Sequence, residues 1–275
     1  MKWIDSHCHL ADPRLDVLRD SWMREAGDCG VDFFMQGGIG PEDWARQKAL
    51  SDRYPGKIGL CFGLHPYWVV DHSLDECEGA LDFLAREAAG NQCLAVGEIG
   101  LDLRPHIAKD SEARQVEVFT LQLELAEVLK KPIVLHLVQA YDLCQTIFDQ
   151  VFDQVFHQRL DQKADHRLHG FVHSFNGSWE QAEKYLQRGL LLSVGGPLCR
   201  ASSRRLQEVV RRIPLTSLLI ETDSPDQPSD RLRGQMNPLA SLIEVAKRVA
   251  ELKQIDLGEV LQSTRDNFVK LMGPK

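Results

Sequence analysis

Ile4-Asp5-Ser6-His7-Cys8-His9 places two histidines two residues apart at the end of a short apolar run. Residues i and i+2 of a β-strand point to the same face, so the two imidazoles can bind one metal ion from a single strand. Strand alternation turns Cys8 away from them. Because a His-x-His pair is also common as simple surface polarity, this interpretation depends on finding further ligands along the chain.

Short apolar runs like this one recur along the chain. Eight of them are too short and too rich in β-branched or glycine-bounded residues for helices, and they are Lys2–Asp5, Val31–Gln36, Ile58–Gly63, Cys93–Glu98, Pro132–His136, Leu168–His173, Leu190–Gly195 and Leu218–Asp223. Segments with helical periodicity lie between them, among them Ser111–Leu129, Ser178–Arg188, Ser203–Ile213 and Pro238–Glu251. Eight strands alternating with helices predict an α/β fold, a closed TIM (β/α)8 barrel. The absence of a glycine-rich phosphate loop after the first strand disfavours a doubly wound nucleotide-binding fold.

Length and composition fit one such barrel. With 275 residues, of which 43% are hydrophobic, the chain can bury a large core, and we expect a single domain over residues 1–275. The formal net charge of −8 argues against a protein that coats nucleic acid through a basic surface. No leader peptide or membrane-length apolar run is recognisable, and seven cysteines without a C-x-x-C pair suit reduced thiols. We therefore expect a cytoplasmic protein with no membrane contact.

Ionisable side chains close most of the predicted strands. In a (β/α)8 barrel the chemistry gathers at the C-terminal strand ends, and the residues found there are His7, His9, Glu98, His136, His173 and Asp223. One histidine at a strand end is more often a hydrogen-bonded structural residue than a ligand. Six such residues at one rim are better explained by a shared metal centre.

The motifs around these residues, taken in order, resemble those of a known family. They are His7-Cys8-His9, Gly63-Leu64-His65-Pro66, Gly97-Glu98-Ile99-Gly100-Leu101-Asp102, Leu135-His136, Val172-His173-Ser174-Phe175-Asn176-Gly177 and Glu221-Thr222-Asp223-Ser224-Pro225, followed by Gly234 and Asn237-Pro238. From residue 4 to about residue 270 the chain resembles the TatD family of metal-dependent hydrolases. The resemblance implies an amidohydrolase-type TIM barrel, a divalent metal centre and hydrolysis of phosphodiester bonds in DNA.

The resemblance also implies a ligand set for two ions. His7, His9, Glu98 and Asp223 would hold one, and Glu98, His136 and His173 the second, with Glu98 as the bridge. The residues are compatible with this, because six ligands are too many for one catalytic ion that keeps an open position, whereas two ions about 3.5–4 Å apart can share a carboxylate. Imidazole-rich ligation suits Zn²⁺ or Mn²⁺, whereas Mg²⁺ prefers oxygen ligands. The sequence does not choose among Zn, Mn and Mg as the expected metal.

Asp223 and Glu98 are the expected catalytic residues. A divalent ion lowers the pKa of its bound water from about 15.7 to about 7 and so supplies a hydroxide nucleophile. Asp223 can take up the proton of this water and later pass one to the leaving oxygen. Asp102 is expected to support the metal ligands or hold a ligand histidine.

Substrate-binding residues are expected in the loops. His65 follows the third strand, Arg200 precedes a helix N-terminus and Arg233 lies in the loop after Asp223; arginines and helix N-termini favour phosphate. The run of Arg204, Arg205, Arg211 and Arg212 favours a solvated helix face over the alternative of a phosphate contact.

One departure from the family concerns phosphate recognition. Several TatD-family members carry an arginine shortly after the strand-five histidine, where this chain reads His136-Leu137-Val138-Gln139-Ala140.

The expected function is a 3'-5' exodeoxyribonuclease acting on single-stranded DNA ends, with DNA as substrate and no protein partner identified. Two alternatives stay open: an amidohydrolase-type enzyme for an amide, lactone or small phosphoester, and a non-catalytic metal-stabilised scaffold whose Phe148–Phe156 stripe meets a protein.

Overall fold

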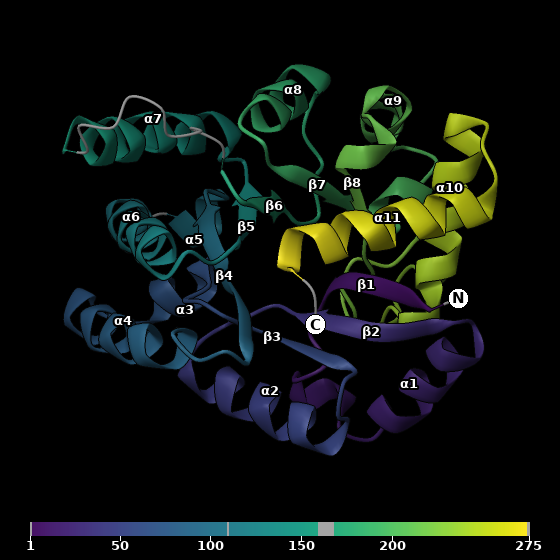
Figure 1. Ribbon diagram of the computed structural model, residues 1–275, viewed down its shortest axis with the longest axis horizontal. Helices are drawn as coiled ribbons and strands as arrows, with labels where there is room; N and C mark the ends of the chain where they lie inside the picture. Colours follow the sequence, from purple (N-terminus) through teal and green to yellow (C-terminus); the bar gives the residue numbers. More distant parts are fainter. Residues whose placement is uncertain (1, 109, 159–167, 274–275) are drawn as a thin grey trace.

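The chain folds as a (β/α)8 barrel (Figure 1), which confirms the predicted fold class. The computed structural model describes residues 2–108, 110–158 and 168–273, with only the backbone described at 152–158. All eight strands are parallel and lie in sequence order, and they are β1 Trp3–Cys8, β2 Val31–Gln36, β3 Ile58–Phe62, β4 Cys93–Asp102, β5 Ile133–Val138, β6 Gly170–Val172, β7 Leu191–Val194 and β8 Leu218–Ile220.

The last strand returns to the first, and hydrogen bonds join their C-terminal ends. The backbone N–H of Asp223 donates to the carbonyl of His7 at 3.0 Å, and that of His9 donates to the carbonyl of Ser224 at 2.7 Å. Within the barrel, the hydroxyl of Ser6 donates to the carbonyl of Ile220 at 2.9 Å. These bonds bring residues more than 200 positions apart in the chain to the same rim.

Helices surround the barrel (Figure 1). They are α1 Arg19–Asp28, α2 Pro41–Arg53, α3 Pro66–Asp71, α4 Leu74–Ala88, α5 Pro105–Ala108, α6 Glu112–Leu129, α7 Tyr141–Gln158, α8 Trp179–Gln187, α9 Arg204–Arg212, α10 Leu242–Lys253 and α11 Leu257–Met272. Local sequence explains several starts: Ser73 and Ser178 form capping boxes for α4 and α8. None of the helices in the described part of the chain is long and apolar enough to cross a membrane.

The core has two parts, one on each side of the sheet. The larger part fills the space between the strands and the outer helices. The smaller part, here called the lower core, fills the barrel interior below the rim and is closed by α11; it comprises Met35, Cys61, Ala95, Val134, Phe171, Leu219, Phe268 and Leu271. Since all eight side chains are buried, the rim above them is supported by close packing.

The strand positions agree with the sequence, but several boundaries differ. β4 continues four residues beyond Glu98 to Asp102, whereas β6 and β8 end before His173 and Asp223. Phe148 of the predicted aromatic stripe is buried on α7, and the side chains at 152 and 156 lie outside the described residues.

Candidate metal centre

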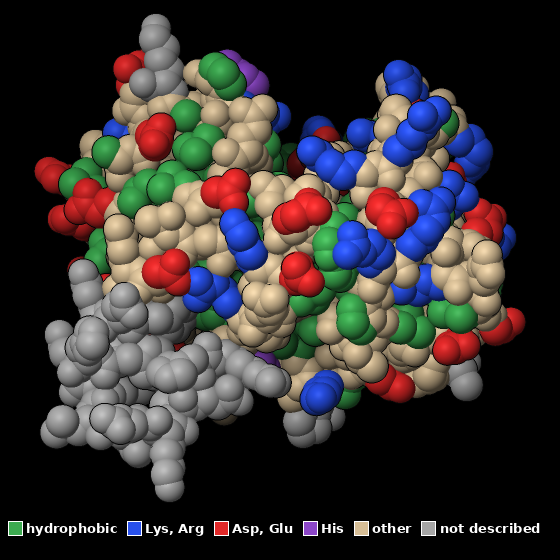
Figure 2. Space-filling view, turned by 90° about the horizontal axis from the view of Figure 1, so that it is seen from above, with side chains coloured by type: hydrophobic (Ala, Val, Ile, Leu, Met, Phe, Trp, Pro, Cys, Tyr) green, Lys and Arg blue, Asp and Glu red, His purple; other side chains and the backbone are tan. Residues whose placement is uncertain are grey.

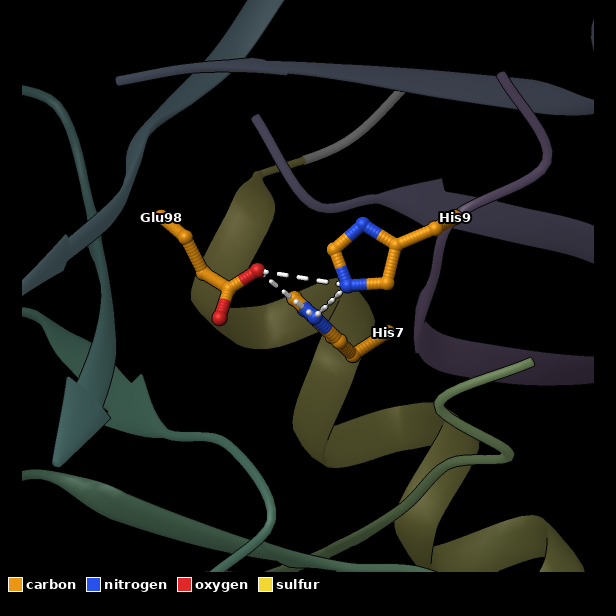
Figure 3. Close-up of side chains that lie close together, drawn as sticks. All are labelled: His7, His9 and Glu98. Carbon is orange, nitrogen blue, oxygen red and sulfur yellow. Dashed lines mark hydrogen bonds and ion pairs between the residues drawn. The ribbon is translucent and has the colours of Figure 1, made fainter. Parts of the chain in front are cut away.

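β1 supplies the first two side chains of the site. Strand alternation sends the imidazoles of His7 and His9 to one side, where their Nε2 atoms lie 3.3 Å apart. Cys8 points elsewhere, with its Sγ 3.4 Å from the carbonyl of Met35. Figure 3 shows both Nε2 atoms turned toward the carboxylate of Glu98. The geometry is the one that the His-x-His spacing predicts.

Glu98 lies at the middle of the site and divides its two oxygens between two groups of histidines. Its Oε2 is 3.2 Å from His7 Nε2 and 3.4 Å from His9 Nε2. Its Oε1 is 2.8 Å from His136 Nδ1 and 2.6 Å from His173 Nε2. A carboxylate in this position can bridge two cations.

Glycine is required beside this carboxylate. A Cβ on Gly37, just after β2, would lie 2.6 Å from Glu98 Oε2 and equally close to carbons of His7 and His9. Gly100 has a φ of +144°, and a Cβ there would lie 2.0 Å from the carbonyl oxygen of His136. Any larger residue at either position would displace the side chains of the site.

Asp223 completes the first group of side chains. Its Oδ1 is 3.4 Å from His9 Nε2 and 3.7 Å from His7 Nε2. The residue has a φ of +57°, a conformation that Asp tolerates better than most residues, and its N–H is bonded to the carbonyl of His7. The bond fixes the backbone turn that aims the carboxylate at the two histidines.

His65 lies in the cluster. Its Nδ1 accepts a hydrogen bond from the N–H of Tyr67 at 3.0 Å and caps the start of α3. The opposite atom, Nε2, is 3.4 Å from Glu98 Oε1 and 3.2 Å from His136 Nδ1. From the sequence, His65 was expected to contact the substrate. The position of its side chain also makes it a candidate fourth ligand in the second group, beside Glu98, His136 and His173. We call seven of these side chains the rim cluster: His7, His9, His65, Glu98, His136, His173 and Asp223.

Further carboxylates support the rim cluster from behind. Asp102 Oδ2 lies 3.7 Å from His136 Nε2 and is also paired with Arg104 at 2.6 Å. Glu221 Oε1 lies 3.7 Å from His173 Nδ1 and accepts a hydrogen bond from the N–H of Ser174 at 2.6 Å. Carboxylates in such positions orient ligand histidines and raise their basicity. Asp102 was expected to have this role from its place in the sequence, whereas Glu221 was not.

Charge is distributed unevenly within the rim cluster. Burial opposes ionisation of Glu98, but the surrounding histidines outweigh it and hold the pKa of this carboxyl well below its usual range. Burial also opposes protonation of His9, yet Asp223 and Glu98 raise the pKa of His9 to about 9. For His65, burial and then His136 lower the pKa to about 4. The ionised carboxylate of Glu98 therefore has a neutral imidazole, His65, on one side and a readily protonated imidazole, His9, on the other.

The rim cluster fits divalent metal ions. Its donor atoms form three overlapping groups, and within each group the atoms lie within 4.8 Å of one another. The groups are His7–His9–Glu98, His7–His173–Asp223 and His65–Glu98–His136. Oε2 of Glu98 is buried and accepts no hydrogen bond from the described residues, although two histidine nitrogens lie nearby. Imidazole nitrogens and carboxylate oxygens are the ligands that Zn²⁺ and related divalent ions take.

Two pockets flank the rim cluster and share His136, His173, Asp223 and Gln227. The α9 pocket, of about 510 Å³, is further lined by Gln139, Tyr141, Asn176, Gln181, Arg200 and Arg205. The α3 pocket, of about 430 Å³, is further lined by Asp12, Arg14, Ile39, Asp43, Arg46 and Tyr67, together with His65, Glu98 and Asp226. The cluster therefore adjoins open space on two sides.

The expected phosphate-binding arginines lie in different places. Arg200 lines the α9 pocket, and its guanidinium donates to the carbonyl of Pro228 at 2.9 and 3.1 Å. Arg233 is paired with Asp230 at 2.5 Å and lines a separate depression beside Arg200. Sequence reasoning did not single out Arg205, because the helical charge run around it is typical of a solvated face.

Comparisons with known proteins agree with this geometry. A family model described as TatD related DNase matches residues 4–273. The chain is 31% identical over 271 residues to the uncharacterized metal-dependent hydrolase YjjV of Escherichia coli (strain K12), covering 98% of this chain and 97% of YjjV. It is 27% identical over 277 residues to deoxyribonuclease TATDN3 of Homo sapiens, covering 98% and 93%. A crystal structure of YjjV, a TatD homologue from E. coli, matches with a TM-score of 0.84 at 29% identity, covering 98% and 97%.

Proposed function

This chain belongs to the TatD related DNase family of metal-dependent hydrolases, and we propose that it hydrolyses phosphodiester bonds of DNA at single-stranded ends. One observation carries the proposal: the two oxygens of Glu98 face different groups of imidazoles. Oε2 lies within 3.4 Å of the Nε2 atoms of His7 and His9, and Oε1 lies within 2.8 Å of nitrogens of His136 and His173. A bridging carboxylate of this kind serves two-ion hydrolysis of phosphate esters. We further propose that the chain acts as one catalytic domain.

Two divalent ions are proposed, divided by Glu98. One would be held by His7, His9, Glu98 and Asp223, and the other by Glu98, His136 and His173, with His65 within reach of the second group. When bound, such ions provide a hydroxide at neutral pH and neutralise charge on the phosphoryl oxygens. Zn²⁺, Mn²⁺ and Mg²⁺ are all candidates, since the donors mix nitrogen and oxygen.

Asp223 is the proposed general base and acid. Its Oδ1 faces the same space as His7 and His9, so the second oxygen or a shifted carboxylate can accept the proton of an attacking water. The same group then returns a proton to the leaving oxygen. The hydrogen bond from its own N–H to the carbonyl of His7 keeps the carboxylate over the site during both transfers.

DNA is the proposed substrate because the flanking pockets suit a nucleotide chain. Each has a volume within the range of about 300–1,000 Å³ that is usual for ligand sites, which is enough for one or two nucleotides. Arg200 supplies positive charge on one side. The human relative TATDN3 is itself named a deoxyribonuclease. We propose 3'-5' polarity, as the resemblance implies.

The test is release of mononucleotides from end-labelled single-stranded DNA with Mn²⁺, Mg²⁺ or Zn²⁺, and with chelator. Asp223→Ala is expected to abolish release. Asp32→Ala is the matched control, because Asp32, on β2, pairs with Lys2 and Lys57 away from the rim cluster. Comparing 5'- and 3'-labelled strands gives the polarity. No release by folded, metal-loaded wild type would contradict the proposal and direct the search to phosphomonoesters, lactones and amides.

A further inference from the structure

We infer that the α9 pocket binds the phosphodiester backbone beyond the scissile linkage, through Arg205 and Arg200, while the α3 pocket receives the terminal nucleoside. This inference rests on the proposed phosphodiesterase function and adds a direction to it. Arg205 and Arg200 would also take the phosphate-binding role that is left open because no arginine follows shortly after His136.

The two pockets differ in charge. Apart from the shared Asp223, the α9 pocket is lined by two arginines and no carboxylate. The α3 pocket also contains two arginines, but Asp12, Asp43 and Asp226 accompany them. Because a run of phosphates is attracted by arginines and repelled by carboxylates, the continuing strand is favoured on the α9 side, where arginines are not offset by carboxylates of the pocket wall.

Arg14, one of the two arginines of the α3 pocket, is already neutralised. Arg14 donates to both oxygens of Asp226, at 3.0 and 2.6 Å, and to Asp12 at 2.7 and 2.9 Å. These bonds tie the loop after β1 to the loop after β8. Little of the Arg14 charge is left for a substrate phosphate, and the second arginine, Arg46, shares the pocket with Asp43, so the pocket suits a nucleoside better than a phosphate.

Arg205, in contrast, retains donors for a ligand. Its Nη2 donates to the carbonyl of Asn176 at 3.0 Å, which uses one of the five N–H donors of a guanidinium and fixes the side chain over the pocket. Two other arginines of α9 are engaged elsewhere: Arg211 pairs with Glu208, and Arg212 lies over the ring of Trp179. Figure 2 shows lysine and arginine side chains gathered over α9 and α10.

Each pocket also presents one tyrosine ring held by its neighbours. In the α9 pocket, the hydroxyl of Tyr141 accepts a hydrogen bond from the N–H of Asn176, and its ring packs on Phe175 at 5.2 Å. In the α3 pocket, Tyr67 is 41% exposed and is hydrogen-bonded to Arg104. Fixed aromatic rings beside a backbone-binding groove stack bases with little sequence preference.

The test compares Arg205→Ala with Arg204→Ala. Both residues are exposed at the start of α9 and have the same charge, but only Arg205 lines the α9 pocket. The substrates are a thymidine decanucleotide and the p-nitrophenyl ester of thymidine 5'-monophosphate, which has no phosphate beyond the scissile one. Arg205→Ala is expected to lower the ratio of kcat/KM for the decanucleotide to kcat/KM for the ester about tenfold, mainly through KM. Arg204→Ala is expected to leave the ratio within about twofold.

Salt dependence separates a phosphate contact from a structural effect. Loss of one contact to a single strand should reduce the slope of log KM against log salt by about 0.7 in Arg205→Ala. Arg205→Lys should restore the slope, because it keeps the charge. An equal change in Arg204→Ala, or an unchanged slope and ratio in Arg205→Ala, would overturn the inference.

The inference and the proposed function can fail separately. If the wild type cleaves the decanucleotide but the two alanine variants behave alike, only the inference fails. If the wild type releases nothing, the proposed function fails, and fluorescence anisotropy of the labelled decanucleotide then decides the inference without turnover. Binding about tenfold weaker in Arg205→Ala than in Arg204→Ala would support it; equal binding, or no binding by the wild type, would overturn it.

Discussion

The two ends of this barrel are built from opposite kinds of side chain. The lower core contains buried apolar side chains packed against α11, whereas the rim cluster contains buried histidines and carboxylates only a few residues further along the same strands. Burying apolar groups stabilises the fold, and burying ionisable groups costs stability unless they are paired. We therefore interpret the lower core as the part that supports the fold and the rim cluster as the part retained for function.

The largest expected effect comes from Glu98→Gln at the rim. Removing the bridging charge should abolish metal retention and lower kcat/KM on single-stranded DNA by at least about a thousandfold. The reason is that metal-ion catalysis and general acid–base catalysis are lost together. The metal-free variant should melt at a lower temperature than metal-free wild type, because the surrounding histidines hold the pKa of Glu98 well below its usual range and the folded state is stabilised by the ionised carboxylate. Mass spectrometry measures the metal content, and calorimetry measures the melting temperature. A variant that retains wild-type metal content would show that Glu98 is no bridge.

At the other end, Phe268→Ala should lower stability and leave metal binding in place. This side chain is 1% exposed on α11 and closes the lower core, so its removal should cost about 3–5 kcal/mol of unfolding free energy. Metal content per folded molecule should be unchanged, because α11 contributes no ligand. Val269→Ala, the next residue on the same helix and 38% exposed, is the control and should change stability by no more than about 0.5 kcal/mol. Urea titration distinguishes the two.

Metal removal links the two ends. At free metal a hundredfold above Kd, binding adds about 2.7 kcal/mol to the stability of the folded state, and chelation should remove this amount. Phe268→Ala should lose the same increment as wild type, and Glu98→Gln should lose almost none. Urea titrations with and without chelator measure the increment. Equal losses in all three proteins would mean that the stabilising metal lies outside the rim cluster.

The smallest effect is expected behind the rim cluster, from Asp102→Asn. This substitution keeps the shape but removes the charge that faces His136 Nε2 and pairs with Arg104. Loss of such a supporting carboxylate should weaken metal affinity about 10–100-fold while leaving the fold intact. Competition with a metallochromic chelator gives the affinity. Unchanged affinity would restrict Asp102 to fixing the loop that follows β4.

The sequence predicts the rim better than the pockets, for a physical reason. His7, Glu98 and His173 are recognisable because strand periodicity and the C-terminal-end rule convert positions in the chain into positions in space. The extension of β4 past Glu98 depends on its pairing with β5, which local sequence does not encode. Arg205 differs from Arg204 only by contacts with a loop some thirty residues away, so helical periodicity cannot separate them.

The central claim is that Glu98 bridges two divalent ions between the two groups of histidines. The most direct test is anomalous X-ray diffraction from crystals of the protein grown with Mn²⁺, recorded on both sides of the manganese absorption edge. The account predicts two anomalous peaks flanking the Glu98 carboxylate, one beside His7 and His9 and the other beside His136 and His173. A protein that binds manganese in solution but shows no peak at Glu98 would contradict it.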